Sequence, residues 1–67
     1  MSPKYAQIAS QLRTEIRSGV YREKGKLPTE KELSETYGVN RQTIRRALSL
    51  LAQAGLIERR QGSGSFL

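Results

Sequence analysis

The sequence predicts a mainly α-helical fold in which three helices precede a small two-stranded β-hairpin. Three observations support it. Apolar residues recur at helical spacing from Tyr5 to Ile16, two further helical patterns meet at Gly38, and a short strand–turn–strand pattern covers residues 56–67. The chain has 67 residues, enough for one small domain, so we treat residues 1–67 as a single unit.

The first helix has a clear start, face and end. Ser2 can cap it, and Pro3 suits the first helical position because its missing N–H is not needed there. Gly19 can end the helix in a left-handed conformation. The face that we expect to be buried consists of Tyr5, Ile8, Ala9, Leu12 and Ile16.

A second helix is predicted after the polar loop of residues 21–26. Leu27 precedes Pro28 and should be extended, and Thr29 with Glu32 fits a capping box. Lys31 is a cation in the first turn, where the helix dipole disfavours it. That conflict has two equally good explanations: a phosphate or base as the partner of Lys31, or ordinary surface placement.

The turn at Gly38 joins this short helix to a basic one. Leu33 and Tyr37 form the apolar face of the short helix, and Val39 can fill the turn. Asn40 can cap a third helix over residues 41–54, with Gly55 at its C-terminus. Its apolar stripe consists of Ile44, Ala47, Leu48, Leu51 and Ala54. Two short helices joined by a tight turn form a helix-turn-helix, and the alternative is a helical hairpin in an ordinary three-helix domain.

The start and outer side of the third helix carry the side chains that we expect to bind DNA. Arg and Gln have the donor geometry to read base edges in the major groove. Arg45 should project from the middle of the helix, and Arg46 should point more directly away from the core. The candidate contacts here are Asn40, Arg41, Gln42, Thr43, Arg45 and Arg46.

The last segment predicts a hairpin, which turns the helix-turn-helix into a winged helix. Residues 56–60 and 65–67 read as strands with Ile57 and Phe66 facing inward. Gly62, Ser63 and Gly64 would form a tip able to approach the sugar-phosphate chain or enter the minor groove; a bare turn is the alternative. A phosphate-binding loop is disfavoured because a strand, not a helix, follows.

Charge supports a polyanionic partner. The net charge is +6, and residues 38–67 hold five Arg and one Glu, with no acidic residue from Gly38 to Ile57. A solvated basic surface is the alternative. Arg59 and Arg60 alternate along a strand, so at most one faces DNA, and the sequence does not show which.

Composition argues against several other classes. The chain has no Cys and no His, which removes disulfides, common zinc sites and the usual acid–base catalyst, so we expect no enzyme, metal or cofactor. No apolar run approaches the ~20 residues of a membrane span, and no signal peptide is evident. We therefore expect a cytoplasmic protein.

Taken together, these motifs resemble the N-terminal DNA-binding domain of the GntR family of bacterial transcription regulators. The matching segments are 3–8, 27–33, 37–48, 55–57 and 62–66, together with Gly19 and Leu51. The opening segment is similar to the branch whose regulatory domain is like that of HutC. Lys31 stands where many members have Arg, and Asn40 where Ser is frequent.

The resemblance implies a repressor that binds a palindromic operator in double-stranded DNA as a homodimer. It places Lys31 and Arg41 at guanines, Thr43 and Arg45 at phosphates or bases, and Gly62 and Gly64 in the minor groove. It also implies a C-terminal domain, absent from these residues, that binds a small effector and dimerises. We expect the domain alone to be monomeric. A winged helix that binds protein or structured RNA is the alternative.

Overall fold

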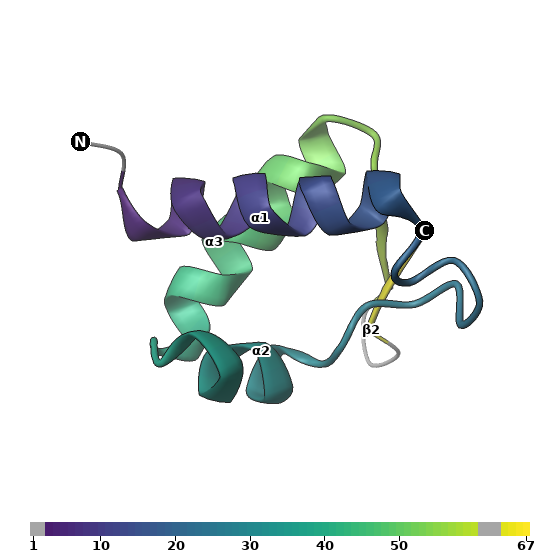
Figure 1. The fold of residues 1–67 in the computed structure, drawn as a ribbon. Coiled ribbons are helices and arrows are strands. Elements are labelled where there is room, and N and C mark those ends of the chain that lie inside the picture. Colours follow the sequence, from purple (N-terminus) through teal and green to yellow (C-terminus); the bar gives the residue numbers. More distant parts are fainter. Residues whose placement is uncertain (1–2, 61–63) are drawn as a thin grey trace.

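The computed structural model describes residues 3–60 and 64–67. Its helices are α1 (Lys4–Ser18), α2 (Glu30–Tyr37) and α3 (Arg41–Gln53). Its strands are β1 (Glu58–Arg60) and β2 (Gly64–Phe66), which pair antiparallel. The predicted order of three helices and a two-stranded hairpin is therefore confirmed. In Figure 1, α3 extends from beside α2 to beside α1, and the hairpin lies near the C-terminal end of α1.

The core lies where α3 packs against both other helices. Ile8 and Leu12 of α1 and Ile44 and Leu48 of α3 are the largest fully buried side chains. The other buried apolar residues are Ala9, Leu27, Leu33, Ala47, Leu51 and Ile57. The predicted apolar stripes are thus confirmed, except that Tyr5 and Ile16 are only partly buried and Ala54, which follows the last residue of α3, is exposed.

The predicted N-terminal caps of α2 and α3 are present. The Thr29 hydroxyl accepts a hydrogen bond from the Glu32 N–H at 3.1 Å, and the Glu32 carboxylate accepts one from the Thr29 N–H at 2.9 Å. The Asn40 side chain accepts from the Thr43 N–H at 2.9 Å. These caps satisfy backbone donors that have no partner within the helix. They fix where α2 and α3 begin, and so the geometry of the turn between them.

Two helix ends differ by one position from the prediction. Pro3 occupies the cap position of α1 rather than its first turn, and its φ of −57° with ψ of 155° is extended. The predicted Ser2 cap lies outside the described residues. At the other end of the domain, Ala54 caps α3, and Gly55 follows with a positive φ of 76°. Gly19 ends α1 in the left-handed conformation, as predicted.

The hairpin pairs with a third extended segment that the sequence did not reveal. Lys26 forms an isolated antiparallel bridge with Phe66, and the Leu27 N–H donates to the Ser65 carbonyl at 3.0 Å. The Leu67 N–H donates to the Gly25 carbonyl at 3.0 Å. Residues 25–27 therefore fix the position of β2 relative to the start of α2.

This pairing corrects the predicted orientation of β2. Ser65 is buried, whereas Phe66, which was predicted to pack inward, is only half-buried and does not belong to the core cluster. Since side chains alternate along a strand, a buried Ser65 turns Phe66 to the opposite face. There its ring lies between two cations, with Lys26 Nζ at 5.6 Å and Arg60 Cζ at 4.7 Å from the ring centroid.

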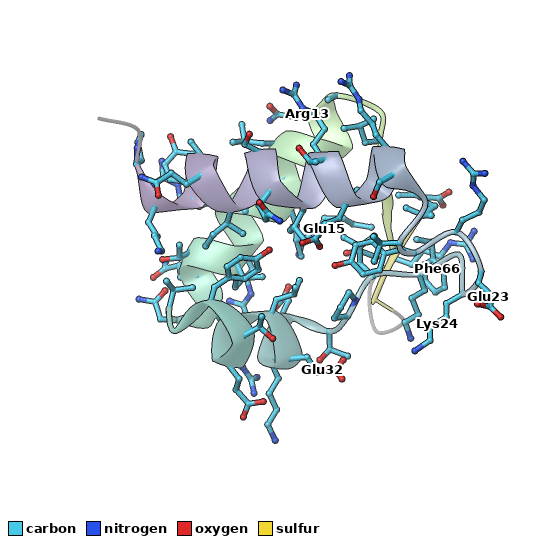
Figure 2. The ribbon with its side chains drawn as sticks, viewed as in Figure 1. Arg13, Glu15, Glu23, Lys24, Glu32 and Phe66 are labelled. Atoms are coloured by element: carbon cyan, nitrogen blue, oxygen red, sulfur yellow. The ribbon has the colours of Figure 1, made fainter. Side chains whose placement is uncertain are left out.

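The loop after α1 is tied back to that helix. The Tyr21 hydroxyl donates a hydrogen bond to the Glu15 carboxylate, and Figure 2 shows Glu15 on the side of α1 that faces α2. Burial, then this bond and the carboxylate charge, raise the pKa of Tyr21 far above its usual range. Within the described residues, no helix combines the length and apolar character that a membrane span requires.

Candidate nucleic-acid interface

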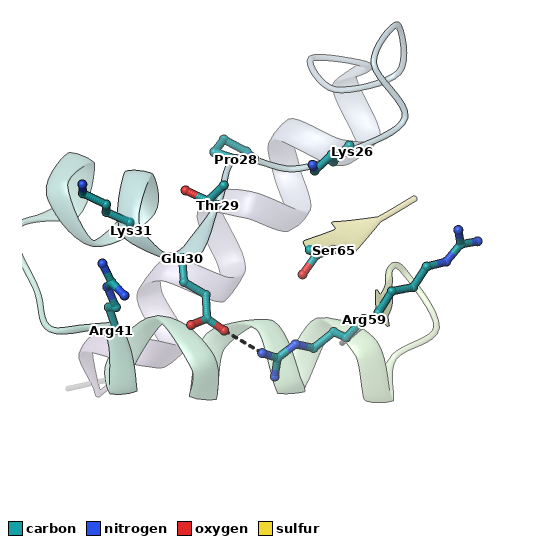
Figure 3. Close-up of a pocket in the computed structure, with 10 residues that line it drawn as sticks. Lys26, Pro28, Thr29, Glu30, Lys31, Arg41, Arg59 and Ser65 are labelled. Carbon is teal, nitrogen blue, oxygen red and sulfur yellow. Dashed lines mark hydrogen bonds and ion pairs between the residues drawn. The ribbon is translucent and has the colours of Figure 1, made fainter. Parts of the chain in front are cut away.

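A groove lies between the start of α2, the start of α3 and the hairpin (Figure 3). Cationic side chains from all of these elements line it, together with the carboxylate of Glu30. The cations are Lys26 and Lys31, Arg41, Arg59 and Arg60. The groove therefore concentrates positive charge on one surface of a small domain, which favours a polyanionic ligand.

Lys31 and Arg41 are two exposed cations at the starts of neighbouring helices. Lys31 lies in the first turn of α2, and Arg41 is the first residue of α3. Both side chains are exposed, and neither has a hydrogen-bond or ion-pair partner within residues 3–60 and 64–67. The two predicted guanine-contacting positions thus share one groove and hold their donors ready for an external partner.

Asn40 and Thr43 form a closed local pair at the start of α3. The Asn40 Oδ1 accepts from both the backbone N–H and the hydroxyl of Thr43, at 2.9 and 3.1 Å. This oxygen is therefore committed to capping the helix. Gln42, the neighbouring candidate, is exposed. Of these three, the geometry leaves Gln42 the most available for an external contact.

Arg45, which was predicted to project from the middle of α3, is exposed and also forms an ion pair with α2. Its Nε donates to a carboxylate oxygen of Glu30 at 2.9 Å, although the side chain remains 57% exposed. The same carboxylate accepts from Arg59 on β1, also at 2.9 Å. Figure 3 shows the Arg59–Glu30 bond crossing the groove. Glu30 therefore connects α2, α3 and the hairpin.

Arg46 contacts a different part of the domain. Its guanidinium carbon lies 4.2 Å from the ring centroid of Tyr5 on α1, a cation–π geometry. Arg46 is exposed, as predicted, but it lies against the aromatic ring instead of extending freely from α3. It does not line the groove that holds Lys31 and Arg41.

The two hairpin arginines, which the sequence could not separate, have distinct surroundings. Arg59 reaches toward α3 and α2, because its Nη1 donates to the Ser49 hydroxyl at 3.3 Å and its Nη2 to Glu30. Arg60 stacks on Phe66 and pairs with Glu58 at 3.3 Å. Arg60 and Lys26 thus flank one ring at the hairpin end of the groove.

Gly64 is the one predicted tip residue among those described; Gly62 and Ser63 lie outside them. Its φ is +105°, and a Cβ placed there would lie 3.1 Å from the Lys26 Cε. A side chain at this position would be strained and would crowd Lys26. Gly64 therefore has a structural role beside any approach to DNA.

Sequence reasoning missed Glu30 and Lys26. It gave Glu30 no part in the site, and it placed Lys26 in the polar loop of residues 21–26. Both owe their position to partners far along the chain: Glu30 to Arg59, and Lys26 to Phe66. The partners of Glu30 lie 15 and 29 residues away along the chain, so no local motif in the sequence signals these pairings.

The three helices, the capped turn between α2 and α3, and the paired hairpin define a winged helix-turn-helix domain. Residues 4–67 match the model of the bacterial regulatory proteins of the gntR family. The chain belongs to this family.

Curated relatives match over almost the whole chain. It is 43% identical over 65 residues to the HTH-type transcriptional repressor NagR of Bacillus subtilis, covering 97% of this chain and 27% of the relative. It is 40% identical over 63 residues to the Uxu operon regulator of Haemophilus influenzae, covering 94% and 24%. The chain thus spans about a quarter of the length of these two relatives.

Solved structures confirm the fold. The chain superimposes on the AraR DNA-binding domain in complex with operator ORE1 with a TM-score of 0.88 and 41% identity, covering 100% of this chain and 82% of that one. The same domain in complex with operator ORR3 gives a TM-score of 0.87 at 41% identity, covering 81% of that chain.

Proposed function

We propose that this chain is the sequence-selective DNA-binding domain of a bacterial transcription repressor. The supporting observation is the groove at the start of α3, where Lys31 and Arg41 are exposed and have no internal partner among the described residues. Its similarity to an operator-bound AraR domain supports the same function. In this proposal α3 enters the major groove of duplex DNA.

Each group of side chains has its own part in the proposed complex. Lys31 and Arg41 read base edges, and Arg is the better suited to a bidentate contact with guanine. Gln42, Thr43, Arg45 and Arg46 contact phosphates or neighbouring bases. The hairpin, with Gly62, Ser63 and Gly64 at its tip, approaches the minor groove.

Control by a small effector belongs to the remainder of a longer protein. The chain spans about a quarter of its repressor and regulator relatives, which leaves room in such proteins for effector binding and dimerisation. One copy of the domain would occupy each half of a palindromic operator, and the domain alone would be monomeric. A repressor of this kind acts in the cytoplasm. No step requires a cofactor.

Selection of bound sites from a random duplex library tests the proposal. The wild-type chain should enrich one short motif, and a dimeric fusion should enrich two inverted copies of it. Failure to enrich any motif would overturn the proposal. Tighter binding to structured RNA than to the selected duplex would favour the alternative, a winged helix that binds RNA.

A further inference from the structure

Among the described residues, the Glu30 carboxylate is the one acidic group lining the cationic groove, and each of its oxygens accepts from a different arginine. Oε1 lies 2.9 Å from the Arg45 Nε, and Oε2 lies 2.9 Å from the Arg59 Nη2. The Glu30 side chain is 29% exposed, less than either partner. A carboxylate beside a proposed DNA site opposes phosphate binding through its negative charge.

The two arginines are held in different ways. Both terminal nitrogens of Arg59 have acceptors within the chain, Nη2 on Glu30 and Nη1 on the Ser49 hydroxyl. Arg45 donates to Glu30 through Nε alone. Its two terminal nitrogens have no acceptor among the described residues, and its side chain is 57% exposed. Among the described residues, both terminal nitrogens of Arg59 are therefore occupied. Arg45 is oriented through its Nε, and its two terminal nitrogens remain available to an external ligand.

We propose that Glu30 is a positioning residue for DNA binding by Arg45, with Arg59 and Ser49 holding the carboxylate in place. This inference rests on the proposed function. A free arginine loses rotamer freedom when it binds a phosphate or base, and prior fixation by Glu30 removes much of that cost. The charge of Glu30 acts in the opposite direction, because it repels the DNA backbone.

Because these two effects are opposite, the direction in which a substitution of Glu30 changes DNA affinity is informative. In the chain that keeps Arg45, Glu30→Ala should weaken binding to the selected duplex by about twofold to tenfold, the cost of ordering one long side chain. In an Arg45→Ala background nothing remains to be positioned. There Glu30→Ala should leave affinity unchanged or raise it, since a repulsive charge is lost. The experiment is this four-member set, measured by titration at fixed salt.

Two controls keep the comparison clear. Glu35→Ala removes the same charge from the same helix at an exposed position without an arginine partner among the described residues, and it should not weaken binding in either background. Thermal unfolding gives the midpoint temperature of every variant. DNA titrations at a temperature well below the lowest midpoint then compare the affinities of folded proteins.

Each outcome decides the inference. Dependence of the Glu30→Ala loss on Arg45 supports positioning. An equal loss in both backgrounds would overturn it and indicate that Glu30 itself binds DNA, for instance by accepting from cytosine N4. A gain in both backgrounds would overturn it in favour of simple repulsion. If the wild-type chain selects no duplex, the proposed function fails instead. NMR then tests the contact between Arg45 and Glu30 in the protein without DNA: the Arg45 Nε–H should lose its hydrogen-bonded shift in Glu30→Ala.

Discussion

The guanidinium of Arg46 on α3 stacks 4.2 Å from the ring centroid of Tyr5 on α1. This contact joins the N-terminal part of α1 to the outer side of the helix proposed to read DNA. It also places Arg46 away from the groove lined by Lys31 and Arg41. The basic residues of α3 therefore divide into two groups with different neighbours.

The Tyr5–Arg46 pair should contribute to stability. Exposed cation–π contacts are worth about 0.5–1 kcal/mol, so Tyr5→Leu and Arg46→Ala should be coupled by roughly that amount in the free energy of unfolding. Chemical denaturation of the two single variants and the double variant measures the coupling. Tyr5→Phe keeps the ring and should keep most of it. Additive losses from Tyr5→Leu and Arg46→Ala would show that the stacking adds nothing.

Arg41→Ala should reduce discrimination at one base pair of the selected site. A bidentate contact between arginine and guanine is worth roughly 1–3 kcal/mol of discrimination, and alanine removes both donors. Titration against the selected duplex and its single-base variants measures this. Arg13→Ala is the control, since Figure 2 shows Arg13 on the side of α1 away from α2. Unchanged discrimination in Arg41→Ala would remove Arg41 from the reading positions.

Substitution of Gly64 should affect both folding and binding. Gly64→Ala places a side chain at a φ of +105° and 3.1 Å from the Lys26 Cε, so it should cost about 1–3 kcal/mol of stability and displace Lys26 from the groove. Gly55→Ala is the matched control, with a φ of +76° and no atom within 4 Å of the added Cβ. We expect both variants to lose stability, but only folded Gly64→Ala to lose DNA affinity. Equal affinities of the two variants would exclude the Gly64 end of the hairpin from the interface.

The capping box should make stability depend on pH. The hydrogen bonds from the Thr29 N–H and hydroxyl hold the pKa of Glu32 below its ordinary value of 4.5. The unfolded chain therefore binds the proton more readily, and the stabilisation, complete above the ordinary value, is lost as pH falls through the lowered pKa. Between about pH 7 and pH 3, the thermal midpoint of Glu32→Gln should fall less than that of wild type. If the thermal midpoint of Glu32→Gln falls as much as that of wild type, the cap does not titrate.

Local signals in the sequence were enough to predict most of the fold. Thr29 with Glu32, Asn40 with Thr43, and Gly19 each act within a few residues of their position, so their roles follow from short motifs. The apolar stripes of α1 and α3 follow in the same way. The orientation of Phe66 was wrong because it depends on Lys26, forty residues earlier, and not on the pattern within the strand itself.

The site shows the same division. The resemblance to the GntR family placed Lys31 and Arg41 at guanines, and the structure brings both to one groove. The sequence could not show that Arg45 is bound by Glu30, nor separate Arg59 from Arg60. Those facts depend on where α2, α3 and β1 meet. Spacing along the chain does not encode that meeting point.

The most direct test of the central claim, sequence-selective binding to duplex DNA by this cationic surface, is affinity as a function of salt. It should be measured for the selected duplex and for a permuted duplex of the same composition. We predict that log affinity for both falls linearly with log salt, with a slope of about −0.9 for each phosphate neutralised, and that the selected duplex binds more tightly throughout. Equal affinity for the two duplexes, or affinity that does not change with salt, would contradict the account.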